Sequence, residues 1–119
     1  MSQAKKITED EKSERDLTAF QQNILHVLAE EERYGLAIKR ELESYYGFEV
    51  NHGRLYPNLD TLVDMGLVTK SELDKRTNEY ELTYEGYEAI LKQFEWKLSK
   101  FVTNYDRAQD IYDLVDDLK

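Results

Sequence analysis

The chain has 119 residues, enough for one domain with a single core and an appended element. It contains no cysteine, which excludes a disulfide framework, thiolate metal sites and a cysteine nucleophile. Its formal net charge of −9 disfavours nonspecific nucleic-acid binding. No apolar run predicts a membrane span or a signal peptide, so we expect a cytoplasmic protein.

Residues 1–16 are almost all polar, with four positive and five negative side chains. Such a segment cannot bury enough apolar surface to offset its ordering, so we expect a mobile arm. A first helix is predicted to begin near Leu17, with Asp16 or Thr18 as its N-cap, and to end before Gly35. Its apolar residues recur at helical spacing: Phe20, Ile24, Val27 and Leu28.

Two further helices and a hairpin are expected before residue 83. Gly47 suits the position after the second helix, and Asn51 suits the N-cap of a third helix that Gly66 closes. The apolar positions of these helices are Ile38, Leu42 and Tyr45, then Leu55, Leu59 and Leu62. Extended runs at 67–73 and 79–82 flank a polar loop at 74–78, which predicts a β-hairpin. This order is typical of a winged helix-turn-helix, among several small α+β folds.

The last segment has the clearest periodicity. Apolar residues alternate at spacings of four and three, as in a heptad repeat: Tyr87, Leu91, Phe94, Leu98, Phe101, Tyr105, Ala108, Tyr112 and Val115. Thr83 is a suitable N-cap, and we expect one continuous helix that forms a homodimer seam. The alternative is two helices, broken near Asn104, that pack back on their own chain.

The sequence gives little support to an enzyme. It has no glycine-rich phosphate loop, no paired histidines at metal-ligand spacing and no nucleophile elbow. Its many carboxylates are explained by a solvated surface. We therefore expect no catalytic residues, no metal and no cofactor.

The third helix offers a row of polar residues, which we expect on the face opposite the leucines: Asn51, Arg54, Asn58 and Thr61. Arginine can pair with guanine, asparagine with adenine, and threonine can contact a thymine methyl group. An ordinary amphipathic helix would carry a similar polar exterior. Pro57 indicates that this helix begins late or bends there, because proline is costly inside a helix.

Several motifs together resemble the PadR-like transcriptional regulators. They are Tyr34-Gly35, the element Gly53-x-Leu55-Tyr56-Pro57-x-Leu59, then Gly66-Leu67-Val68, and Tyr80-x-Leu82-Thr83-x-x-Gly86. The resemblance covers residues 17–90, and the acidic charge is similar to that of the haloarchaeal RosR group. It implies winged-helix homodimers that bind operator DNA through the third helix and dimerise through the C-terminal helix.

With this fold, we expect the third helix to direct Asn51, His52, Arg54 and Asn58 toward bases, with Thr61 on the same helix. Where this chain has Asn51 and Arg54 the family often has a small serine or threonine, so the operator sequence is not assigned by analogy. A second set would contact the DNA backbone: Lys75, Arg76, Lys39 and, as the resemblance implies, the hydroxyl of Tyr56. The hairpin lacks the glycine- and proline-rich tip common in the family. Some relatives stack planar effectors on a tryptophan of the C-terminal helix, where Trp96 lies off the heptad stripe; packing against the first helix or the arm would also explain it. No effector is assigned.

The sequence therefore predicts a mainly α protein with a small β-hairpin, a winged helix-turn-helix followed by a dimerisation helix. We expect an arm at 1–16, a DNA-binding domain at 17–82 and a dimerisation segment at 83–119. The expected function is transcriptional regulation by a homodimer on a pseudo-palindromic operator, adapted to high salt. The alternative is a coiled-coil adaptor that does not bind DNA, which the acidic charge favours.

Overall fold

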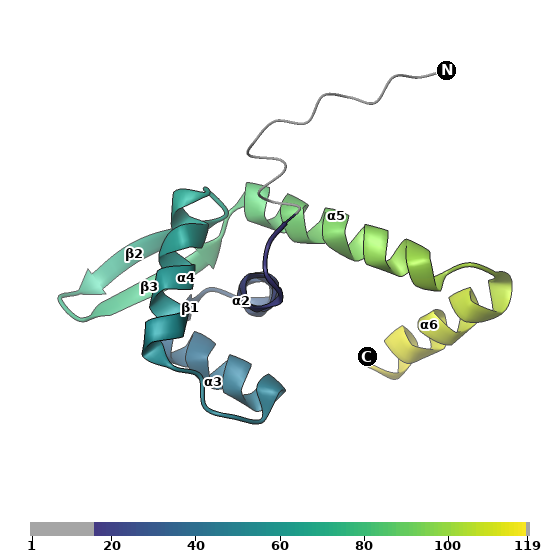
Figure 1. The fold of residues 1–119 in the computed structure, drawn as a ribbon, viewed down its shortest axis with the longest axis horizontal. Coiled ribbons are helices and arrows are strands. Elements are labelled where there is room, and N and C mark those ends of the chain that lie inside the picture. Colours follow the sequence, from purple (N-terminus) through teal and green to yellow (C-terminus); the bar gives the residue numbers. More distant parts are fainter. Residues whose placement is uncertain (1–15, 119) are drawn as a thin grey trace, which may run out of the picture.

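The computed structural model describes residues 16–118, so the expected arm lies outside the described residues except for Asp16. In chain order the elements are α2 (Ala19–Glu30), β1 (Arg33–Tyr34), α3 (Gly35–Tyr46), α4 (His52–Asp64), β2 (Val68–Asp74), β3 (Thr77–Leu82), α5 (Tyr84–Phe101) and α6 (Tyr105–Asp117). Figure 1 shows α2, α3 and α4 clustered beside the β2–β3 hairpin, with α5 extending away from them. The expected class, mainly helical with a small hairpin, is confirmed.

Local capping explains where the first helices begin and end. Thr18 Oγ1 accepts the N–H of Gln21, whose side chain accepts the N–H of Thr18 in return, so α2 opens with a capping box. Gly47 ends α3 with φ of 78°, a left-handed conformation that glycine adopts without a steric penalty. Asn51 caps α4 by accepting the N–H of Gly53.

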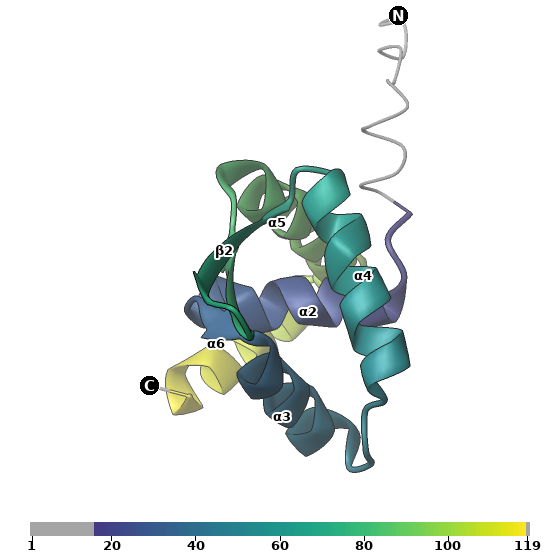
Figure 2. The same ribbon diagram turned by 90° about the vertical axis from the view of Figure 1, so that its left-hand side faces the viewer.

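The core lies between the three clustered helices and the inner face of the hairpin. Leucines at the expected positions of α4 are fully buried, as are the apolar residues of α2 and α3 that face them: Ile24, Leu25, Ile38, Leu42, Leu55, Leu59 and Leu62. Figure 2 shows α2 crossing behind α4, with α3 below α2. Burial of these side chains fixes the orientation of α4 relative to the rest of the domain.

The sheet has one strand more than the sequence predicted. The two-residue strand β1 pairs with β3, which also pairs with β2, so Tyr80 has Arg33 on one side and Lys70 on the other. The hairpin is tighter than the expected loop at 74–78, because Asp74 pairs with Thr77. Asp74 Oδ1 accepts the N–H of Arg76 at 2.8 Å, which stabilises the turn.

The beginning of α5 is part of the domain core. Thr83 caps α5, and its hydroxyl donates to the Gly66 carbonyl at 2.7 Å. A Cβ atom at Gly86 would overlap the Leu67 carbonyl oxygen, so only glycine permits this close approach of α5 to the chain before β2. Ala89 and Ile90 are buried one turn later.

The expected continuous C-terminal helix is wrong. α5 ends at Phe101, and α6 begins at Tyr105 and turns back beneath α5 (Figure 1). Asn104 has an extended backbone, and its side chain accepts the N–H of Arg107 at 3.0 Å. This N-cap offers the chain an alternative to continuing the helix.

The alternative of two helices packed on their own chain is also only half right. The break near Asn104 is present, but no residue of α6 is buried. Ala108 and Ile111 are half-buried, and the other apolar residues of α6 are exposed in the single chain. Within residues 16–118, no helix is both long enough and apolar enough to cross a membrane.

Candidate nucleic-acid interface

The first turn of α4 presents three of the predicted base-reading residues. Asn51, His52 and Arg54 are all exposed, although Asn51 also caps the helix. The His52 ring stacks on Tyr56, with centroids 5.6 Å apart and planes 3° apart. Arg54 lies over the ring of Phe20 on α2, with its guanidinium carbon 4.0 Å from the ring centroid. These side chains are therefore exposed and also held by neighbours.

Pro57 lies inside α4, so the expected late start of this helix is wrong. The helix begins at His52 and is continuous to Asp64. Gly53 and Pro57 are four residues apart and share the outward face of the helix, where both are exposed. Neither has a long side chain, so this face of α4 permits close approach of its backbone to a partner. Asp60 and Asp64 continue the same exposed face toward the end of the helix.

The polar row of α4 does not lie opposite the leucines, and that part of the prediction is wrong. Asn58 and Leu62 are four residues apart, so they lie on the same side of a helix. Asn58 is half-buried: its side chain donates to the Arg54 carbonyl at 2.7 Å and accepts from Gln21 Nε2 at 3.1 Å. Thr61 is exposed, and its hydroxyl donates to the Pro57 carbonyl at 3.0 Å.

Tyr56 packs against the beginning of α3. A Cβ atom at Gly35 would lie 2.7 Å from the Tyr56 hydroxyl, so the glycine makes room for the tyrosine. Between these elements and the hairpin lies an open cavity of about 320 Å³. It is lined by Tyr34, Gly35, Leu36, Tyr56, Arg76, Thr77, Asn78 and Tyr80. The cavity joins the start of α3, the middle of α4 and the hairpin in one concave surface.

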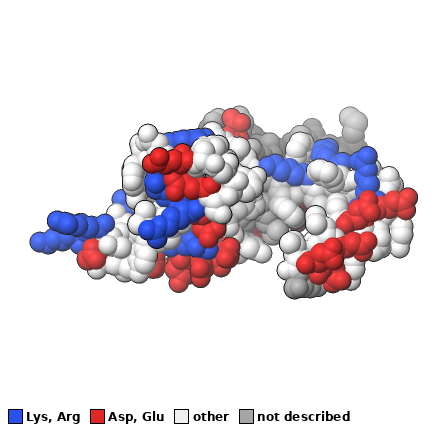
Figure 3. Space-filling view, turned by 90° about the horizontal axis from the view of Figure 1, so that it is seen from below, with Lys and Arg blue, Asp and Glu red and all other residues white. Residues whose placement is uncertain are grey.

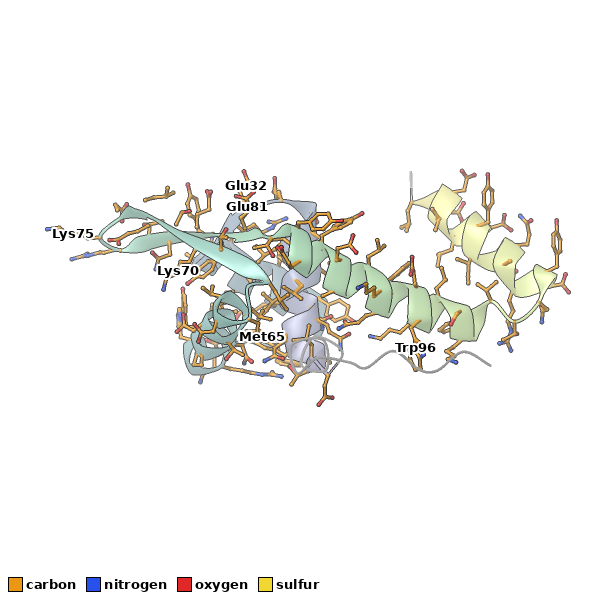
Figure 4. The ribbon with its side chains drawn as sticks, turned by 90° about the horizontal axis from the view of Figure 1, so that it is seen from above. Glu32, Met65, Lys70, Lys75, Glu81 and Trp96 are labelled. Carbon is orange, nitrogen blue, oxygen red and sulfur yellow. The ribbon has the colours of Figure 1, made fainter. Side chains whose placement is uncertain are left out.

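The side chains predicted to contact the DNA backbone differ in exposure and in their ion pairs. Lys75 and Arg76 are exposed at the tip of the hairpin, and Figure 4 shows Lys75 projecting from it. Lys39 on α3 is half-buried, and its ammonium meets Glu43 Oε2 at 3.1 Å. Lys70, which the sequence did not single out, lies on the side of the hairpin near α4 and 3.8 Å from Asp60.

The residues of the predicted heptad stripe form two short exposed faces. Tyr87, Leu91, Phe94, Leu98 and Phe101 lie on α5, and Tyr105, Ala108, Tyr112 and Val115 lie on α6. Only Leu98 and Ala108 are half-buried; the others are exposed. Trp96 projects from α5 away from α6 in the view of Figure 4 and has Lys100 over its ring at 5.1 Å. It is 63% exposed, so packing against α2 does not explain it, and the alternative of packing against the arm lies outside the described residues.

Charge is unevenly distributed over the surface. Figure 3 shows basic side chains at the tip of the hairpin and acidic ones gathered over α6. Five aspartates and one arginine occur in α6. Residues 17–82 have seven basic and twelve acidic side chains, so even this part of the chain is acidic. Among residues 16–118 there is no cluster of three side chains able to hold a metal ion.

Sequence reasoning missed the contacts that α2 makes with α4. Phe20 is in the core as expected, but its ring also contacts Arg54 of α4, and Gln21, which was given no role, donates to Asn58. Gln21 and Asn58 are 37 residues apart, and nothing in the spacing of either helix indicates this pairing.

Residues 24–92 match the Transcriptional regulator PadR-like family, which is more than half of the chain. No curated protein matches the chain. Among solved structures, the structure of H. salinarum RosR grown from NaBr is 70% identical in sequence to this chain. Its TM-score is 0.84, and the match covers 87% of this chain and 94% of that one. A complex structure of RosR is 68% identical, with a TM-score of 0.86 over 88% of this chain and 94% of that one.

A more distant structure shares the fold. Bacillus subtilis PadR in complex with operator DNA is 20% identical, with a TM-score of 0.56 over 81% of this chain and 66% of that one. At this identity the likeness concerns the winged helix-turn-helix fold alone.

Proposed function

Because the chain belongs to the PadR-like family of transcriptional regulators, we propose that it is a homodimer that binds a specific duplex DNA sequence through α4. The observation that carries this proposal is the first turn of α4, where Asn51, His52 and Arg54 are exposed at the end of a helix anchored by three buried leucines. In helix-turn-helix proteins the N-terminal residues of the second helix contact base edges in the major groove.

Within this proposal the side chains divide into two groups. Arg54 pairs with guanine, and Asn51 and His52 contact neighbouring base edges. Asn58 contributes only after exchanging one of its bonds to Arg54 or Gln21 for a bond to a base. Thr61, further along the same helix, can touch a thymine methyl group. The second group contacts phosphates, which positions the protein without reading sequence: Tyr56, Lys75, Arg76 and Lys39.

The homodimer would form through the exposed faces of α5 and α6. Two short helices joined at Asn104 cannot make one long seam, so we propose that α6 of one protomer packs on α5 of its partner. Charge supports this arrangement. α6 carries five aspartates and one arginine, whereas residues 91–101 of α5 carry three lysines and one glutamate. Opposite local charges favour pairing of the two helices across the interface.

A symmetric dimer reads a pseudo-palindrome, because two-fold symmetry repeats the same contacts on both half-sites. The half-sites would be about one helical turn, or a multiple of it, apart. The acidic charge sets the conditions for binding: a dimer of this chain carries −18, twice the −9 of one protomer, and repels DNA at low salt. We therefore propose that its DNA binding is adapted to high salt, with an affinity that stays flat or rises as salt increases.

The rival function is a coiled-coil adaptor that does not bind DNA, which the net charge favours. Selection from fragmented genomic DNA, at about 0.1 M and about 1 M KCl, separates the two, since the higher concentration screens repulsion beyond roughly 3 Å. The regulator enriches a common motif in at least one condition. Failure to enrich any motif in both would contradict DNA recognition and favour the adaptor.

A further inference from the structure

Arg54 is held by a residue of another helix. Its guanidinium carbon lies 4.0 Å from the centroid of the Phe20 ring, and Phe20 is the second residue of α2. The ring itself is fixed, because Phe20 is only 4% exposed and stacks on Tyr46 with centroids 6.2 Å apart and planes 18° apart. Phe20 is therefore a rigid platform beneath an exposed arginine.

A second contact ties the same part of α4 to α2. Gln21, the residue after Phe20, donates to Asn58 Oδ1 at 3.1 Å, and Asn58 Nδ2 donates to the Arg54 carbonyl at 2.7 Å. The backbone of Arg54 is thus linked to α2 through Asn58, while its side chain contacts α2 directly. Among the described residues, no ion pair competes for the Arg54 guanidinium.

We propose that Phe20 is a positioning residue for sequence recognition: its ring holds the Arg54 guanidinium in the orientation in which it meets a base. This inference rests on the proposed role of Arg54 as a base reader. Stacking uses the flat face of the guanidinium, whereas its hydrogen bonds leave in the plane of the group. A guanidinium that lies flat on the Phe20 ring, as the 4.0 Å distance from its carbon to the ring centroid allows, keeps its donors free for the O6 and N7 atoms of guanine.

If Arg54 is already held before DNA binds, less side-chain conformational entropy is lost on binding. A free arginine has many rotamers, and selecting one of them on binding opposes association. The Phe20 ring makes part of that selection in the unbound protein. A Phe20 that served the core alone would affect folding but not the choice between DNA sequences, and this difference makes the two roles separable.

The test is a double-mutant cycle on the duplex enriched from genomic DNA and on a scrambled duplex of the same length. Phe20→Leu keeps an apolar core residue but removes the aromatic face. Leu28→Ala, a buried position in the last turn of the same helix, is the control for lost core packing. Fluorescence anisotropy gives, for each protein, the ratio of the dissociation constant for the scrambled duplex to that for the enriched duplex. Thermal unfolding shows that each protein remains folded.

Phe20→Leu is expected to lower the ratio roughly twofold to fivefold, the range of an exposed cation–π contact. Phe20→Leu should lower the ratio no further in an Arg54→Ala background, and Leu28→Ala should leave the ratio unchanged. An unchanged ratio in Phe20→Leu, or an equal loss with and without Arg54, would overturn the positioning role alone. An unchanged ratio in Arg54→Ala would overturn base reading by Arg54, and the positioning role with it.

A measurement on the unmodified protein does not depend on how well the variants fold. In a nitrogen–proton NMR spectrum of the unbound protein, the Arg54 Nε–H signal should be shifted upfield by the Phe20 ring current. A signal at the ordinary position of a solvated arginine would show that the guanidinium is not held on the ring, which would overturn the proposal.

Discussion

Glu43 and Val50 join the two helices of the helix-turn-helix. The Val50 N–H donates to Glu43 Oε2 at 2.8 Å, and the same carboxylate meets Lys39 Nζ at 3.1 Å. Val50 immediately precedes Asn51, the N-cap of α4. The carboxylate on α3 therefore fixes the point at which α4 begins, and with it the position of the exposed residues of the first turn.

This contact predicts a loss of stability in acid. The Val50 N–H, followed by the Lys39 ammonium, lowers the pKa of Glu43 below its ordinary value of 4.5. Because the folded-state pKa is the lower one, the stabilisation is complete above pH 4.5 and is lost as pH falls through the folded-state value. We expect Glu43→Gln to weaken the decline in the free energy of unfolding between about pH 5 and pH 3. Urea unfolding at several pH values across this range measures the free energy of unfolding of both proteins.

The matched control for Glu43 is Glu49→Gln, since Glu49 is an exposed carboxylate in the same turn. It should leave the acid-dependent decline as steep as in the unmodified protein. If Glu43→Gln and Glu49→Gln behave alike, the Glu43–Val50 bond does not hold the turn.

Arg54 is expected to determine sequence discrimination rather than overall affinity. Arg54→Ala should reduce the preference for the enriched duplex over a scrambled one by about 1–3 kcal/mol, the value of one bidentate arginine–guanine pair. Arg54→Lys should also lose most of this preference, because lysine keeps the charge but lacks the planar fork. Anisotropy with both duplexes gives the result. Equal weakening on the two duplexes in Arg54→Ala, with recovery in Arg54→Lys, would identify a phosphate contact instead.

Assembly is expected to depend on the apolar faces of α5 and α6. Leu98→Glu and Phe101→Glu should each break the dimer, because each places an unpaired charge where apolar side chains meet. Both should also abolish tight DNA binding. Ser99→Glu adds the same charge at an exposed position between them and off the stripe, so it should leave the dimer intact. Light scattering measures the mass; full-strength dimers in the first two variants would contradict this interface.

Salt dependence is expected to be unusual for a DNA-binding protein. Ordinary DNA binders lose affinity with salt, with a slope set by the number of phosphates neutralised. Here repulsion from the acidic surface is screened as salt rises, so affinity should stay flat or increase between about 0.1 and 1 M KCl. Asp64 lies on the exposed outward face of α4, and Asp64→Asn should therefore raise affinity mainly at low salt.

A KCl titration with the enriched duplex tests the salt prediction. A log–log slope of −4 or steeper, equivalent to about four to five neutralised phosphates, would contradict adaptation to high salt. That slope would leave DNA binding itself intact, because it would mean that the acidic residues all point away from the DNA.

Local signals predicted the elements of the domain well. Thr18, Gly47 and Asn51 cap or end helices where the sequence indicated, because these residues act through contacts within a few positions of themselves. The strand β1 was not predicted, since two residues carry no periodic pattern and pair only because β3 lies beside them. The break between α5 and α6 was predicted only as the alternative, because the regular apolar spacing of the last segment favours one continuous helix, whereas the Asn104 side chain caps a new one.

The candidate site was less predictable than the fold. Side chains on the first turn of α4 are exposed as expected, but Asn58 contacts Gln21 and the Arg54 guanidinium lies over the Phe20 ring. Both contacts depend on how α2 crosses α4, which follows from packing of the whole core rather than from either helix. The placement of Asn58 could have been foreseen in part, because it is one turn from the buried Leu62.

Hydroxyl-radical footprinting of the enriched duplex, with the mass of the complex from light scattering, tests the central claim most directly. The account predicts two chains on one duplex and two protected regions related by symmetry, with centres about one helical turn or a multiple of it apart. A single protected region bound by one chain, or a duplex that is protected nowhere, would contradict a dimer that reads DNA through both copies of α4.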